Sequence, residues 1–137
     1  MPNETFYIGQ SSGCKKAFTA EETLYYCRHL SGDNNPLHYD AEYAAKTRFK
    51  KCIVPGIMVS SLFGGILGSV LPGNGTIQLG QTCRFINPVF IDEEVEAVIT
   101  ITNIRQDKPV ITFLTRVIKR DGTIAIEGEA VVLVATN

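Results

Sequence analysis

The stretch IVPGIMVSSLFGGILGSVL occupies residues 53–71 and carries no charged side chain. Pro55 fits the first turn of a helix, because proline has no N–H to leave unsatisfied there. We predict a helix from Pro55 to about Val70, apolar on most of its surface and therefore surrounded by other structure. The stretch is long enough to span a membrane, but its proline, glycines and serines and the lack of a second span favour a helix buried inside the fold.

After Gly75 the apolar residues recur with a period of two, which is typical of strands. The pattern places Ile77, Leu79, Cys83 and Phe85 on one face of a first strand, and Val95 to Ile101 on the next. Residues 110–119 are apolar on both faces, which predicts a central strand. A last strand follows, with Ile124, Ile126, Ala130, Val132 and Val134 on one face.

Two shorter helices are predicted before residue 53. Thr19 and Glu22 fit a capping box at the start of a helix from Ala20 to Leu30, and Asp40 can cap a second from Ala41 to about Thr47. Helices first and antiparallel strands afterwards indicate an α+β fold, with the sheet wrapped around the apolar helix. Because such a sheet leaves edge strands exposed, we expect a homodimer in which two sheets pair.

Composition limits the function. The 137 residues predict a single domain spanning 1–137. A net charge of −1 gives no sign of a nucleic-acid partner or an anionic membrane surface. Two histidines and four widely spaced cysteines make a poor metal site, so we expect no metal and buried, reduced thiols in a cytoplasmic protein. Residues 1–4 do not begin a secretory signal.

The segment SGDNNPLH, residues 31–38, holds a carboxylate and an imidazole five residues apart on a stretch rich in turn formers. Asp33 and Asn35 could simply form an Asx-turn that closes the loop. His38 alone would be interpreted as a hydrogen-bonded structural histidine. His29, on the preceding predicted helix, is interpreted as structural.

The pattern Asp33-x-Asn35-Pro36-x-His38 resembles the motif of the MaoC-like hydratase family, and within it that of the short (R)-specific enoyl-CoA hydratases. The resemblance covers residue 19 to the C-terminus. It continues through Ala44 and through four further segments, residues 53–56, 71–75, 87–90 and 128–130. It implies the hot-dog fold, in which an antiparallel sheet wraps a long helix, and dimers whose sheets join.

The resemblance also implies hydration of a trans-2-enoyl thioester to an (R)-3-hydroxyacyl thioester, which feeds polyester synthesis or related fatty-acid metabolism. In that chemistry Asp33 is the base that activates water, and His38 shares the proton transfer. Asn35 orients the loop or the carboxylate, and the N–H of Gly56 holds the developing enolate oxygen. No cofactor is implied, because the substrate is itself a coenzyme A thioester.

Substrate contacts are predicted at two places. Bulky residues that could form the floor of an acyl tunnel, and so favour short or medium chains, are Leu62, Phe63, Leu67 and Val132. A basic cluster at Lys46, Arg48, Lys50 and Lys51 is either a solvated face or a contact for the phosphates of coenzyme A, with Arg48 and Lys50 the candidates. Relatives commonly carry His where this chain has Pro55, which leaves substrate preference open there.

Other functions stay open. The same fold could dehydrate a branched or dicarboxylic hydroxyacyl-CoA or a thioester of acyl carrier protein. A non-catalytic hot-dog protein that binds acyl groups is an alternative from another class, but it predicts the loss of Asp33 or His38, and both are present. The complete motif therefore favours an enzyme.

Overall fold

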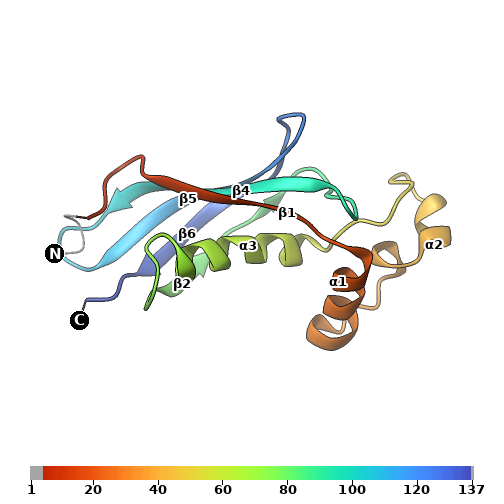
Figure 1. Ribbon diagram of the computed structural model, residues 1–137, viewed down its shortest axis with the longest axis horizontal. Coiled ribbons are helices and arrows are strands. Elements are labelled where there is room, and N and C mark those ends of the chain that lie inside the picture. The colour runs from red at the N-terminus through yellow and green to blue at the C-terminus, as the bar shows by residue number, and fades with distance from the viewer. Residues whose placement is uncertain (1–4, 137) are drawn as a thin grey trace.

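The protein, seen here in a computed structural model, is described over residues 5–136. An antiparallel six-stranded sheet has the order β1-β4-β5-β6-β2, with β3 also paired to β6. Helix α3 lies against one face of this sheet (Figure 1). The strands are β1 (Ser11–Ala17), β2 (Ile77–Gln81), β3 (Arg84–Phe85), β4 (Glu94–Ile104), β5 (Val110–Lys119) and β6 (Ile124–Leu133). The predicted α+β arrangement is confirmed.

Helix α3 (Gly56–Ser69) is present where it was predicted, but it begins one residue later than expected, with Pro55 at the N-cap position. One side of it enters the core, where Phe63 and Leu67 are fully buried. Burying a side chain of that size contributes about 1.5–3 kcal/mol. The prediction that this helix is surrounded is wrong for the single chain, because Ile57 remains 62% exposed and Gly64 and Gly65 face outward. The sheet covers only one side of the helix.

The sheet supplies the rest of the core. Along β4, the side chains from Val95 to Ile101 alternate between buried and more exposed, which confirms the predicted face. Strand β5 lies between β4 and β6, which confirms its central place. On β6 the predicted face is buried from Ile126 onward, and Ile124 is only partly buried because the register with β5 shifts between Val117 and Ile118.

The first predicted strand is corrected in two respects. It is divided into β2 and β3, which pair separately with β6. The face that these residues were predicted to share lies largely outside the core, because Ile77, Leu79 and Phe85 are 58%, 56% and 53% exposed. A period of two identifies residues that share a face, but it does not say whether another element covers that face.

The segment before α3 extends beyond one end of the sheet (Figure 1). It contains α1 (Ala20–Tyr25), the π-helix η2 (Tyr26–Ser31), the 3₁₀-helix η3 (Pro36–His38) and α2 (Ala41–Ala45). The capping box of Thr19 with Glu22 is confirmed, and so is the Asp40 cap. The predicted α-helix over 20–30 changes to a π-helix after Tyr25 and leaves Leu30 68% exposed.

Thiol burial differs from expectation. All four cysteines are free, as expected, but only Cys27 is buried, and the others are half-buried. Within residues 5–136 there is no helix long and apolar enough to cross a membrane. The expectation about a secretory signal depends on residues 1–4, which lie outside the described residues.

Candidate active site

Two consecutive side-chain turns shape the loop between η2 and η3. Gly32 ends η2 with a φ of 72°, in the left-handed region that glycine adopts without a steric cost. Asp33 Oδ1 then accepts a hydrogen bond from the Asn35 amide at 3.0 Å. The side chain of Asn35 in turn accepts from the Leu37 amide at 3.1 Å and caps η3. The two turns therefore follow each other directly along the chain between Asp33 and His38.

The second carboxylate oxygen of Asp33 faces the imidazole. Oδ2 lies 3.3 Å from Nε2 of His38. The imidazole side chain is 10% exposed and the carboxylate 38%, so the carboxylate faces solvent while the ring lies beneath the surface. The Asx-turn and the proposed chemistry therefore do not exclude each other, because each uses a different oxygen of Asp33.

The backbone of Ile53 fixes the ring of His38. Nδ1 of His38 lies 2.8 Å from the Ile53 carbonyl oxygen, and the Ile53 amide donates to the Leu37 carbonyl. Because a carbonyl oxygen only accepts hydrogen bonds, this contact places a proton on Nδ1. Nε2, which faces Asp33, is then the nitrogen that can take up or give away a proton.

The same segment connects the loop to α3. Ile53 forms a β-bridge with Phe90, and the Val54 amide donates to the Val89 carbonyl. Gly56, three residues after Ile53, supplies the first amide of α3, which has no partner within the helix. A side chain at Gly56 would meet the Phe85 ring, because its Cβ would lie 2.5 Å from Phe85 Cδ1. The glycine thus admits an aromatic ring beside the amide.

A groove of about 710 Å³ opens beside this amide. Its walls come from the segment before α3, the first turns of α3 and the loop between β3 and β4, and they include Arg48, Phe49, Ile53, Gly56, Phe85 and Phe90. Asp33 and His38 do not line the groove. His38 nevertheless touches its wall through the Ile53 carbonyl. The groove, the Gly56 amide and the Asp33–His38 pair therefore lie around one short segment.

Of the residues predicted to contact the acyl chain or coenzyme A, only Arg48 lines the groove. Arg48 lines the groove with its guanidinium carbon 4.7 Å from the centre of the Phe49 ring, whereas Lys50 lies outside the lining, with a positive φ of 66°. The tunnel candidates belong to the core or pack against it and do not line the groove, namely Leu62, Phe63, Leu67 and Val132. Their role stays a prediction.

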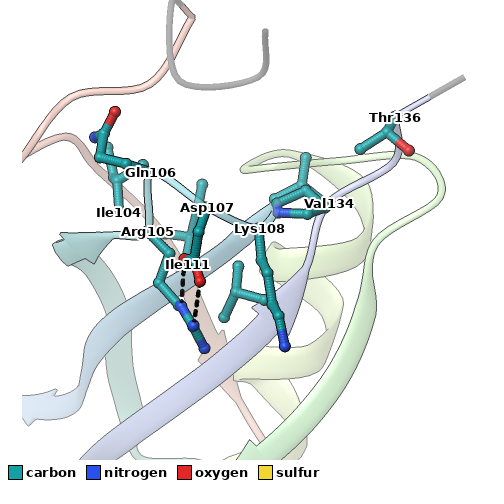
Figure 2. A pocket seen from close by; sticks show the side chains of 10 residues that line it. Ile104, Arg105, Gln106, Asp107, Lys108, Ile111, Val134 and Thr136 are labelled. Carbon is teal, nitrogen blue, oxygen red and sulfur yellow. Dashed lines mark hydrogen bonds and ion pairs between the residues drawn. The ribbon is translucent and has the colours of Figure 1, made fainter.

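A second cavity, of about 320 Å³, lies where β4 turns into β5, at the end of the sheet away from α1 and α2 (Figures 1 and 2). Arg105 donates to both carboxylate oxygens of Asp107 there, at 2.9 and 2.7 Å. Hydrogen bonding from Arg105 lowers the pKa of Asp107. A carboxylate paired in this way is a poor base, and neither histidine lines this cavity. We therefore place the site at the other end.

Three groups around the loop were not predicted, because no residue pattern in the sequence points to them. The Ile53 carbonyl is a backbone group. The Ser31 hydroxyl donates to the Tyr26 carbonyl and accepts from the Asp33 amide. Cys27 is fully buried. Burial raises the pKa of its thiol, and the negative charge of Asp33 raises it further, so the thiol stays neutral. Among the described residues no His, Cys, Asp or Glu cluster could hold a metal ion.

Comparison with known proteins identifies the family. The sequence profile described as a MaoC like domain matches residues 7–122. An (R)-specific enoyl-CoA hydratase of Aeromonas caviae is 44% identical over 132 residues, covering 96% of this chain and 98% of that protein. The mitochondrial 3-hydroxyacyl-(acyl-carrier-protein) dehydratase FERN of Solanum lycopersicum is 40% identical, covering 90% of this chain and 74% of that protein.

Solved structures show the same fold. The (R)-hydratase from A. caviae involved in PHA biosynthesis superposes with a TM-score of 0.94 at 43% identity, covering 96% of this chain and 99% of that one. R-hydratase PhaJ1 from Pseudomonas aeruginosa in the unliganded form gives a TM-score of 0.92 at 32% identity, covering 99% and 86%. The sheet and helix thus have the expected hot-dog arrangement.

Proposed function

The chain belongs to the MaoC-like family, and we therefore propose that it is an (R)-specific enoyl-CoA hydratase. It adds water across the 2,3 double bond of a short- or medium-chain trans-2-enoyl-CoA and forms (R)-3-hydroxyacyl-CoA. As a hydro-lyase it also catalyses the reverse dehydration. The single observation that carries the proposal is the 3.3 Å approach of Asp33 Oδ2 to His38 Nε2, inside the motif that the resemblance identifies.

In the proposed reaction, one water molecule donates hydrogen bonds to both Asp33 Oδ2 and His38 Nε2. Its oxygen forms a bond to C3 of the enoyl group while a proton of the water passes to the pair. The electrons of the double bond move to the thioester oxygen, and the enolate collapses when C2 takes the proton back from the pair, so that one whole water molecule is added. His38 acts through Nε2, because Nδ1 is committed to the Ile53 carbonyl. No cofactor enters, since conjugation with the thioester makes C3 electrophilic in the hydration direction and makes C2 acidic in the reverse one.

Gly56 supplies the proposed donor for the enolate oxygen. Its amide is the first of a 14-residue helix, where unpaired N–H groups and the helix dipole favour negative charge. It borders the groove that is open to a substrate. Donors of this kind contribute roughly 10²–10³ in rate where they have been removed from other enzymes.

The proposed function is tested by mixing the purified chain with crotonyl-CoA and following the absorbance of the enoyl group. We expect the absorbance to fall to an equilibrium value, and the product to be the (R)-3-hydroxy thioester on chiral analysis. An unchanged absorbance would contradict hydration, and an (S) product would contradict the assigned stereochemistry.

A second candidate substrate is a thioester of acyl carrier protein. It is favoured by the 40% identity to a relative named as a dehydratase of that class. The preferred thioester is identified by comparing kcat/KM for the crotonyl thioesters of coenzyme A and of acyl carrier protein. A higher value for coenzyme A supports the leading proposal, and a higher value for the carrier protein supports this one.

Arg48 is the proposed contact for the phosphates of coenzyme A, because it lines the groove next to Phe49. Arg48→Glu is expected to raise KM for crotonyl-CoA several-fold at low salt and less at high salt, since salt screens exposed charges. Lys50, which lies outside the groove lining, stays the second candidate, and Lys108→Glu, where β4 turns into β5 at the opposite end of the sheet, is the matched control. A KM that stays at the wild-type value for Arg48→Glu at both salt concentrations would remove this contact.

The length of the acyl chain is proposed to depend on Leu62, Phe63, Leu67 and Val132. Phe63, Leu67 and Val132 are fully buried in one core cluster, and Leu62 packs against it. An acyl chain that reaches them must pass from the groove into the space between α3 and the sheet. These side chains are accordingly the proposed floor of the acyl site.

We also propose a homodimer. The edge strand β2 exposes Ile77 and Leu79, and α3 exposes Ile57. An edge strand has unpaired backbone groups that a second copy can satisfy. Apolar side chains on such an edge are protected when that copy covers them.

The dimer predicts a sedimentation mass of twice the 15.0 kDa chain. Leu79→Lys is expected to shift the protein toward monomer, because it places a charge on the apolar edge. Leu30→Lys, at an exposed position on η2, serves as the control. A wild-type protein of single-chain mass at micromolar concentration would contradict the dimer.

The proposed location is the cytoplasm. Four free cysteines, none in a disulfide, suit a reducing compartment.

A further inference from the structure

The helix that leads to Asp33 changes its hydrogen-bonding pattern before it ends. It is an α-helix to Tyr25 and a π-helix from Tyr26 to Ser31. In a π-turn each amide donates to the carbonyl five residues back, so the turn contains one residue more than an α-turn. Such turns are rare and frequently occur at functional sites. The chain then leaves the helix through Gly32, whose φ of 72° turns it toward Asp33. The position of Asp33 thus depends on how this turn closes.

The hydroxyl of Ser31 forms a hydrogen bond across the π-turn. Ser31 Oγ donates to the Tyr26 carbonyl, five residues back, at 3.2 Å. The same oxygen accepts from the Asp33 amide, two residues ahead, also at 3.2 Å. A hydroxyl has one donor and can accept at the same time, so both bonds can exist together. One side-chain oxygen therefore connects the last π-turn to the backbone of Asp33.

These bonds complete the restraint on Asp33. Its amide is held by Ser31 and its Oδ1 by the Asn35 amide. Only Oδ2 is left to face His38. A small rotation of the Asp33 backbone would change the 3.3 Å separation from Nε2, on which the shared water depends.

We propose that Ser31 is a positioning residue, which acts on catalysis by fixing the Asp33 backbone, and this inference rests on the proposed function. Ser31 is exposed, and its hydroxyl is bonded to the backbone on both sides. It acts through Asp33 rather than on the substrate. Its removal should therefore change kcat and leave KM unchanged.

The test compares kcat and KM for crotonyl-CoA among wild type, Ser31→Ala, Ser31→Thr and a control, Ser69→Ala, at the distant end of α3. We expect Ser31→Ala to lower kcat on the order of tenfold, the effect of losing one or two neutral hydrogen bonds, with KM within twofold. Ser31→Thr keeps the hydroxyl and should recover most of the rate. Ser69→Ala should match wild type.

A double variant separates this inference from the proposed function. In an Asp33→Asn background, Ser31→Ala should cause no further loss, because its effect passes through the Asp33 carboxylate. An unchanged kcat in Ser31→Ala, or a Ser31→Thr variant as slow as Ser31→Ala, overturns the positioning role while an inactive Asp33→Asn keeps the proposed function. A wild-type rate in Asp33→Asn overturns both.

Discussion

Replacement of Asp33 by Asn is expected to lower kcat for hydration of crotonyl-CoA by on the order of 10²–10⁴, the range for loss of a positioned general acid–base group. The amide keeps an oxygen that can accept from the Asn35 amide, so the Asx-turn should persist. It loses the negative charge that draws a proton from water. Thermal unfolding and KM should therefore stay close to wild type, and stopped-flow or steady-state absorbance gives the rate.

Asp40→Asn is the matched control for this change. Asp40 Oδ1 accepts from the Glu42 and Tyr43 amides at the start of α2, and Asn caps helices as well as Asp does. We expect its kcat to equal that of wild type. If Asp33→Asn were as fast as Asp40→Asn, Asp33 would not be the base.

Gly128→Ala is expected to lower the free energy of unfolding by about 1–3 kcal/mol or more, the usual range for overpacking. A Cβ at Gly128 would overlap the Thr82 carbonyl oxygen, which is a backbone atom that cannot rotate away. Thr82 lies beside β6 at this point, where its amide donates to the Glu129 carbonyl and its hydroxyl accepts from the Glu129 amide. The added methyl must push these bonds apart. Urea unfolding at fixed protein concentration measures the loss.

Gly68→Ala controls for the change from glycine to alanine itself. A Cβ at Gly68 meets no atom within 4 Å, and Gly68 lies inside α3. Alanine is favoured over glycine inside a helix by roughly 1 kcal/mol, so this variant should be at least as stable as wild type. Equal stability of Gly128→Ala and wild type would show that the Thr82 segment can move away at little cost.

Features that depend on a few neighbouring residues could be predicted from the sequence. The capping box of Thr19 with Glu22 and the cap at Asp40 are both present, because each depends on side chains within three residues of the amides they bind. The start of α3 after Pro55 follows in the same way from the missing proline N–H. The Asp33–His38 pair was also predictable, since the motif contains both residues.

Features that no residue pattern records could not be predicted. The π-turn, which the bond from Ser31 to the Tyr26 carbonyl accompanies, has no residue pattern that distinguishes it from an ordinary α-helical end. The exposure of Ile77 and Leu79 depends on what covers the edge strand, which alternation does not record. The contact that orients His38 comes from a backbone carbonyl fifteen residues away, and any residue at position 53 would carry that group.

Asp33 and His38 are proposed to act on the same water as one unit. The measurement that decides this is kcat for crotonyl-CoA hydration by wild type, Asp33→Asn, His38→Gln and the double variant at equal concentration. We predict that each single variant is slower by on the order of 10²–10⁴, and that the double variant is no slower than the worse single one. Single variants as fast as wild type, or a double variant whose loss is the product of the two single losses, would contradict the shared role.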